Sequence, residues 1–196
     1  MSLSCWVRSA AVAGAFNLLA SCSGPPLTVP ASDAAIERIA RPEARLRSTL
    51  FRYGYGSSAV LSDVHRLGRD AGCDAISDAV AASVARHLPI YRRNLIASHR
   101  EQIPPVELAT AARKSPRAAD DMLDAYRDRL WPAFGRKNAG LIPTANQEVI
   151  QAVSARAARE SQRGPPSERQ LKELKYETIG FELCPKLQAI IRMEDE

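Results

Sequence analysis

The side chains that could perform acid–base chemistry are scattered along this chain of 196 residues. The three histidines, His65, His87 and His99, stand far apart in the sequence, and each is interpreted as a surface or packing residue rather than a base. Asp63 could orient the His65 imidazole only from an extended backbone, whereas the flanking pattern predicts a helix. The motifs typical of serine hydrolases, P-loop nucleotidases, dinucleotide-binding folds and HExxH zinc enzymes are absent. The sequence therefore assigns no catalytic residue, no cofactor and no metal.

One enzymatic alternative needs only a single protonated carboxyl group. Helical cell-wall glycosidases can work with one Glu as general acid in a groove. Glu101 and Glu107 flank a predicted bend at Ile103-Pro104-Pro105 and are the candidates for that role. Solvation and helix capping explain both carboxylates more simply, so a cell-envelope hydrolase is the alternative prediction and not the first.

A row of arginines is the candidate binding surface. Arg38, Arg41, Arg45 and Arg52 recur at steps of three, four and seven. The Arg guanidinium binds phosphate in a bidentate manner, so this row could face an anionic lipid headgroup or the phosphates of lipopolysaccharide. The alternative is a solvated helix face in which Glu37 and Arg41 pair at i,i+4.

The N-terminal segment has the pattern of an export signal, because Arg8 precedes a charge-free run from Ser9 to Ala20. As a helix this run would span about 18 Å, whereas the hydrocarbon core of a bilayer is about 30 Å thick. The run is therefore too short for an ordinary transmembrane helix.

The four residues that end this run, Leu19-Ala20-Ser21-Cys22, resemble the lipobox of bacterial lipoproteins. The resemblance implies that a signal peptide, residues 1–21, is removed and that the Cys22 sulfur carries a diacylglyceryl group. Two or three acyl chains hold a protein at a membrane stably, whereas one does so only marginally. Ser23 resembles the residue that follows the lipidated Cys in lipoproteins sent to the outer membrane, so we expect an outer-membrane anchor facing the periplasm. A soluble periplasmic protein, cut near Ala20, is the alternative.

The segment after the lipobox is a predicted tether. Residues 22–32 comprise the lipidated Cys and a linker with Pro25, Pro26 and Pro30. Proline-rich chain extends by up to about 3.1 Å per residue, so the linker can reach roughly 30 Å. Residues 33–196 are long enough for one domain and too short for two domains of ordinary size.

Two cysteines remain after Cys5 leaves with the signal peptide and Cys22 takes lipid. These are Cys73 and Cys184. Because the chain is expected to be exported to an oxidising compartment, we predict that they form a disulfide. Two buried free thiols are the alternative. A metal site is not expected, because no CxxC or His-x3-His spacing accompanies the pair.

The pattern of the mature chain predicts an all-α fold, a single compact domain of several helices. A helix is expected from Ser32 or Asp33, with a break at Pro42. The segment from Phe51 to Ser58, with two glycines and three aromatic residues, is the expected loop. The longest periodic run begins at Asp74, and Pro89 should kink or divide it.

Capping patterns predict the later helices. Ser115-Pro116 should begin one amphipathic helix that continues to Leu130. Thr144 with Gln147, and Ser167 with Gln170, have the spacing of capping boxes. Residues 179–183 alternate like a strand, but no second strand is available to pair with it, so the all-α assignment includes them.

Composition narrows the class of partner. Lys and Arg exceed Asp and Glu by 27 to 22, which gives a net charge of +5, but no Lys/Arg run is interleaved with aromatic residues. Nucleic acid is therefore not an expected partner. Around Ser115-Pro116 the chain also resembles a family of small helical domains of unknown function in bacterial envelope proteins, with Ala118 where those domains have Gly. That resemblance implies no activity.

These patterns together predict a lipid-anchored envelope protein that acts by binding, as a structural or assembly factor. Its expected partners are the membrane, through the lipid on Cys22, and another envelope protein, peptidoglycan or an anionic lipid.

Overall fold

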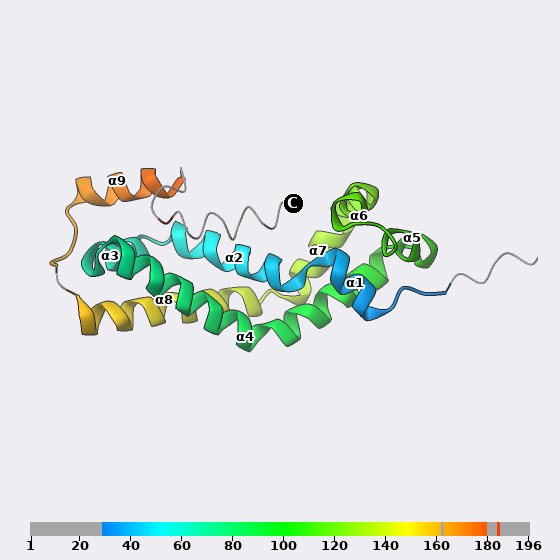
Figure 1. Cartoon of the computed structure of the whole chain (residues 1–196), viewed down its shortest axis with the longest axis horizontal. Helices are drawn as coiled ribbons and strands as arrows, with labels where there is room; N and C mark the ends of the chain where they lie inside the picture. Colours follow the sequence, from blue (N-terminus) through cyan, green and yellow to red (C-terminus); the bar gives the residue numbers. More distant parts are fainter. Residues whose placement is uncertain (1–28, 162, 180–183, 185–196) are drawn as a thin grey trace, which may run out of the picture.

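The computed structural model describes residues 29–161, 163–179 and 184, and this part of the chain is helical without strands (Figure 1). The all-α prediction is confirmed. The helices form an elongated bundle, in which α1, α5 and α6 lie at one end and α3 and α9 at the other.

The first helix, and the start of the second, lie where the sequence predicts. α1 runs from Asp33 to Ala40, and the Ser32 hydroxyl oxygen accepts a hydrogen bond of 3.2 Å from the Ala35 N–H. Arg41 then adopts a left-handed conformation (φ 46°), and Pro42 begins α2, Pro42–Gly56. Proline is favoured at this first position because its missing N–H would have no partner there anyway.

The prediction of a loop at Phe51–Ser58 is wrong. α2 continues to Gly56, and only Ser57 separates it from α3, Ser58–Leu67. Phe51 is buried in the core with 1% of its surface exposed. Burial of one large aromatic side chain stabilises by about 2 kcal/mol or more, which offsets the weak helix propensity of two glycines.

α4, Arg69–Gln102, is the central helix, and it packs against α1, α2, α3, α7 and α8. It begins five residues before the expected Asp74, directly after the turn at Gly68 (φ 89°). Pro89 lies inside the helix and does not divide it, although α4 bends near its middle (Figure 1).

The single helix expected from Pro116 to Leu130 is two helices. α5, Pro105–Ala111, is followed by α6, Pro116–Leu123, then by a 3₁₀ turn, Asp124–Tyr126, and by α7, Arg127–Lys137. The Ser115 hydroxyl oxygen caps α6 by accepting from the Ala118 N–H, as predicted. The change of direction at the 3₁₀ turn lets α6 pack on α1 while α7 packs on α4.

Of the two expected capping boxes, one is correct. α8, Leu141–Glu160, begins before Thr144, whose hydroxyl donates to the Gly140 carbonyl inside the first turn instead of capping the helix. α9, Glu168–Ile179, is capped as predicted, with the Gln170 side chain accepting from the Ser167 N–H at 2.9 Å. Ile179 ends α9, and the rest of the strand-like pattern, residues 180–183, lies outside the described residues.

Two hydrophobic cores lie side by side along the bundle. The larger lies between α2, α3, α4 and α8 and includes Leu50, Ile76 and Val149, all fully buried. The smaller lies beneath α1, α5, α6 and α7 and includes Ile36 and Leu130. Residues of α2, α4, α6 and α7 line the candidate site.

Candidate functional site

Three of the four arginines expected in one row gather at a hollow beside α2. Arg41, Arg45 and Arg52 line it, together with Ser48, so that steps of four, three and four place these residues on one side of α2. The hollow has a volume of about 410 Å³. Its other walls are Tyr91 of α4, Asp120 of α6, and Trp131 and Phe134 of α7.

Arg38 is not part of this surface, which corrects the predicted row. It lies on α1, and its guanidinium donates to the carbonyl oxygens of Ala112 and, at 2.8 Å, Lys114. These bonds hold the connection between α5 and α6. The left-handed residue Arg41 separates α1 from α2, so the two helices do not share one continuous face.

Asp120 is the acidic partner that the sequence did not reveal. Its carboxylate lies 3.5 Å from Arg41 Nη2 and 3.1 Å from Arg45 Nη2. Arg41 therefore does not pair with Glu37, which is 3.5 Å from Arg92 instead. The spacing of the arginines within α2 carried no information about a carboxylate some 75 positions away.

Arg45 is held on three sides. Its Nε donates to the Ala40 carbonyl at 2.8 Å, Asp120 accepts from its Nη2, and its guanidinium lies 4.9 Å from the centre of the Trp131 ring. A cation over an indole face contributes about 0.5–1 kcal/mol at exposed sites. The charged lining consists of three guanidinium groups and one carboxylate, a net charge of +2. The hollow can therefore accept an anion.

A smaller hollow of about 240 Å³ adjoins the first through Arg45, Asp120 and Trp131, and His99 lines it. The His99 Nδ1–H donates to the Leu95 carbonyl at 2.8 Å. Burial lowers the pKa of His99, the hydrogen bond to Leu95 opposes this, and the nearby Arg45 and Asp120 lower and raise it respectively. The imidazole in the folded protein is therefore more readily neutral than in the unfolded chain.

This lowered pKa predicts a pH dependence of stability. Below about pH 6.5 the unfolded chain protonates His99 before the folded protein does, so the free energy of unfolding falls as the pH falls from 6.5 toward the folded pKa. One such group contributes a slope of at most about 1.4 kcal/mol per pH unit. Urea unfolding between pH 7.5 and 5 should show a shallower loss of stability for His99→Gln than for the unmodified protein. Parallel curves for the two proteins would contradict the prediction.

Three other candidate acid–base residues, Glu101, Glu107 and His87, have structural partners. Glu101 Oε1 accepts from Lys137 Nζ at 2.9 Å, and Glu107 accepts from the Tyr126 hydroxyl, which raises the pKa of Tyr126. Neither glutamate lines the hollows described above. His87 Nε2 lies 3.0 Å from Glu148.

The helical backbone predicted around Asp63 and His65 is confirmed by α3. Asp63 instead accepts from the Ser154 hydroxyl at 2.5 Å and from Arg66, and so ties α3 to α8.

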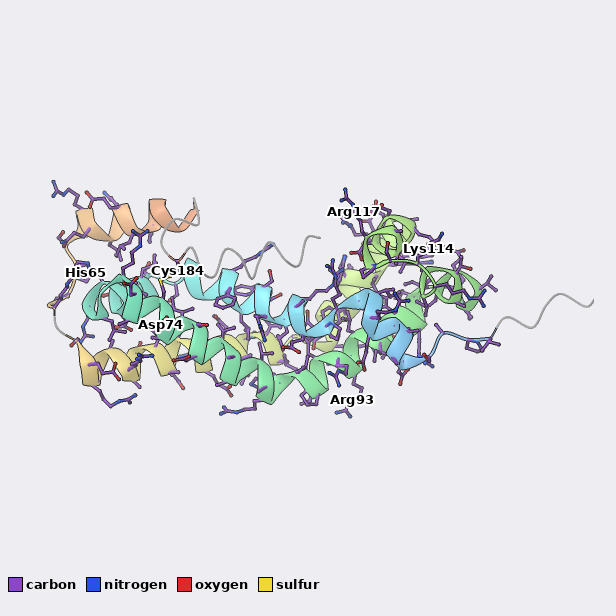
Figure 2. The ribbon with its side chains drawn as sticks, in the orientation of Figure 1. His65, Asp74, Arg93, Lys114, Arg117 and Cys184 are labelled. Carbon is purple, nitrogen blue, oxygen red and sulfur yellow. A yellow bond between two sulfur atoms is a disulfide. The ribbon has the colours of Figure 1, made fainter. Side chains whose placement is uncertain are left out.

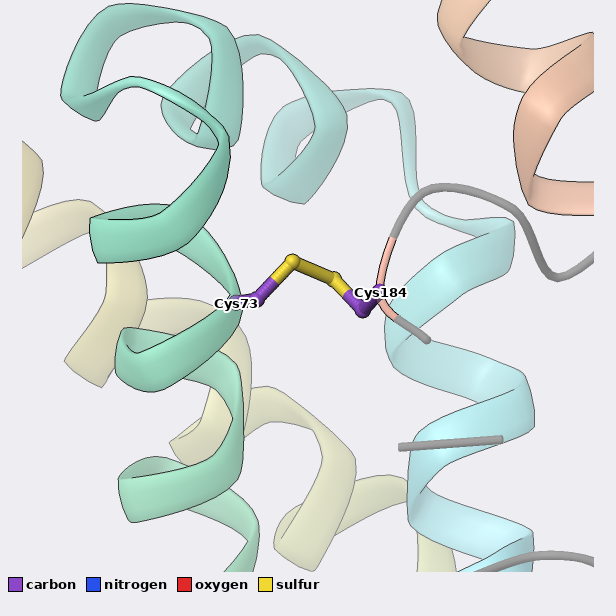
Figure 3. Close-up of a disulfide and its surroundings, with 2 residues drawn as sticks. All are labelled: Cys73 and Cys184. Atoms are coloured by element: carbon purple, nitrogen blue, oxygen red, sulfur yellow. A yellow bond between two sulfur atoms is a disulfide. The ribbon is translucent and has the colours of Figure 1, made fainter. Parts of the chain in front are cut away.

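The predicted cysteine pair is joined in the structure. Cys73 of α4 and Cys184 form a disulfide with their Cα atoms 5.7 Å apart, and Cys184 lies beside α2 (Figure 3). Cys184 is 3% exposed. Cys22 lies outside the described residues.

No protein-family model, curated protein or solved structure matches this chain. The resemblances at Leu19-Ala20-Ser21-Cys22 and around Ser115-Pro116 therefore stay predictions that rest on those residues. Within the described ranges, no helix combines the length and the apolar character needed to cross a bilayer. In the same part of the chain, no three His, Cys, Asp or Glu side chains gather as a possible metal site.

Proposed function

We propose that this chain is a lipid-anchored binding protein of the bacterial cell envelope, held at the outer membrane by acyl chains on Cys22. The observation that carries the proposal is Leu19-Ala20-Ser21-Cys22 at the end of a charge-free run and directly before a proline-rich linker. Asp33, where α1 begins, is the eleventh residue after Cys22, so the linker separates the anchor from the helical domain.

The disulfide and the charged hollow support the same proposal. Structural disulfides persist in oxidising compartments such as the periplasm and are rare in the bacterial cytosol. The hollow on α2 offers guanidinium groups and an indole to a ligand, whereas Glu101 and Glu107 are both engaged by partners outside it. A binding role therefore accounts for more of the described side chains than hydrolysis does.

The intact mass of the protein purified from native membranes tests the anchor. We expect a polypeptide mass that begins at Cys22, increased by the mass of two or three acyl chains. Cys22→Ala should abolish that increase, because the sulfur is the site of acylation. Sedimentation of the separated membranes should place the protein with the outer membrane.

Cys5→Ala is the matched control, because it removes a thiol from the same N-terminal segment and leaves the lipobox unchanged. It should keep the acylated mass. An unacylated chain beginning near Ser21 would instead establish a soluble periplasmic protein and overturn the proposal.

A further inference from the structure

The charged hollow has unused hydrogen-bonding capacity. Ser48 is only 8% exposed, lines the hollow, and its hydroxyl has no hydrogen-bond partner among the described residues. Arg52, one turn further along α2, is exposed and has no acidic partner in the same part of the chain. Ser48 is not among the residues with a fully buried side-chain atom that lacks a partner, so a ligand in the hollow can bond to its hydroxyl in place of water.

Asp120, the carboxylate that pairs with the arginines of the hollow, leaves the hollow able to bind another anion. Asp120 bonds to Arg41 and Arg45, but its side chain is 43% exposed. Such partly exposed ion pairs contribute about 0–1 kcal/mol each. A phosphate group carries more negative charge than one carboxylate and binds guanidinium in a bidentate manner, so it can join or displace Asp120.

A second, more apolar hollow adjoins the charged one. It has a volume of about 480 Å³, and Thr49 and Phe134 line both hollows. Its other walls include Tyr53, which is 56% exposed, together with Ile142 and Pro143 at the start of α8. Both volumes lie in the range of about 300–1,000 Å³ that is typical of small-molecule sites.

We infer that the two hollows together bind an anionic amphiphile with a phosphate headgroup, the phosphate on Arg45, Ser48 and Arg52 and the apolar part against Tyr53, Ile142 and Pro143. Neither hollow alone explains the arrangement, because the first supplies charge and the second supplies apolar surface directly beside it. The inference deepens the proposed function by naming the ligand class of the binding site. A tether of roughly 30 Å keeps such a site within reach of the membrane that contains such lipids.

Trp131 makes this inference directly measurable. It is the single tryptophan from Cys22 onward, and it lines the charged hollow. The chain from residue 22, with Cys22→Ser so that it carries no acyl group, should show a saturable change in Trp131 fluorescence with monomeric oleoyl lysophosphatidic acid. Inorganic phosphate and monooleoylglycerol, which carry only the headgroup charge or only the apolar chain, should each bind at least about tenfold more weakly, because each occupies one hollow.

Variants separate the two halves of the site. Arg52→Gln should weaken the binding of lysophosphatidic acid about tenfold, since it removes a guanidinium from the hollow without breaking an ion pair among the described residues. Arg93→Gln is the matched control, because Arg93 is also exposed but lies on α4, away from α2 (Figure 2). Tyr53→Ala should weaken the binding of lysophosphatidic acid and leave the affinity for inorganic phosphate unchanged.

Any of three fluorescence results would overturn the inference: no saturable change, equal affinity for monooleoylglycerol, or the same affinity for lysophosphatidic acid in Arg52→Gln as in Arg93→Gln. Vesicles of phosphatidic acid and of phosphatidylcholine distinguish a lipid headgroup from free phosphate as the source of the anion. Binding to phosphate with no preference for phosphatidic acid vesicles would also overturn it. Failure of this binding leaves the acylated mass unchanged, so the test does not depend on the test of the anchor.

Discussion

Reduction of the disulfide between Cys73 and Cys184 should lower the free energy of unfolding by about 4–5 kcal/mol. The two residues are 111 positions apart, and in the chain-entropy treatment the closure of a loop of about this length removes entropy from the unfolded state and raises its free energy by that amount. The effect is comparable to the whole stability of many domains, which is about 5–15 kcal/mol. Urea unfolding with and without a phosphine reductant measures it.

The double variant Cys73→Ala/Cys184→Ala is the control for this experiment. It should unfold at the urea concentration of the reduced protein and should not respond to reductant. Mass spectrometry of the untreated protein should show two hydrogen atoms fewer than the reduced form. Identical unfolding curves for the oxidised and reduced protein would contradict the prediction.

Gly72→Ala should destabilise the protein although alanine is the better helix former. A Cβ at Gly72 would lie 2.7 Å from Val64 Cα and 2.8 Å from Val64 Cγ1. The backbone of α3 would have to move away from α4, because Cα cannot rotate aside as the end of a side chain can. Overpacking of this kind costs about 1–3 kcal/mol and outweighs the roughly 1 kcal/mol that alanine gains in helix propensity.

Gly135→Ala is the matched control for Gly72→Ala. Gly135 also lies inside a helix, α7, but no atom of the surroundings lies within 4 Å of the added Cβ. The same substitution should therefore raise the free energy of unfolding by about 0.5–1 kcal/mol. Thermal and urea unfolding of both variants should give shifts of opposite sign, and a neutral or stabilising Gly72→Ala would contradict the close approach of α3 and α4.

The helix caps show how much of the fold local sequence patterns can predict. Ser115 and Ser167 were predicted correctly, and Ser32 was one of the two candidates for the first cap; each lies directly before a helix. Thr144 has the same spacing to Gln147, but α8 begins earlier and Thr144 bonds back to Gly140. A capping residue and a residue in the first turn can share one sequence pattern, and packing of the whole helix decides between them.

The predictions for the aromatic segment after Phe51 and for the amphipathic segment after Pro116 were both wrong, the first by predicting too little helix and the second by predicting too much. The first was expected to be a loop and is helical to Gly56, because Phe51 is buried in the core. The second was expected to be one helix and is divided by the turn Asp124–Tyr126. In both segments the local preference is weak, and contacts with distant helices outweigh it.

The sequence by itself determined the helical class, the start of the first helix to within one residue (Ser32 or Asp33), and the candidate pairing of Cys73 with Cys184, because these depend on local periodicity, capping and cysteine count. It also placed Arg41, Arg45 and Arg52 near one another, because a helical repeat puts such residues on one side of α2. Only the tertiary structure decided that Arg38 turns to the carbonyls after α5, that Asp120 meets Arg45, and that Trp131 completes the hollow. These contacts join residues far apart in sequence, and their geometry follows from how helices pack, which no local pattern encodes.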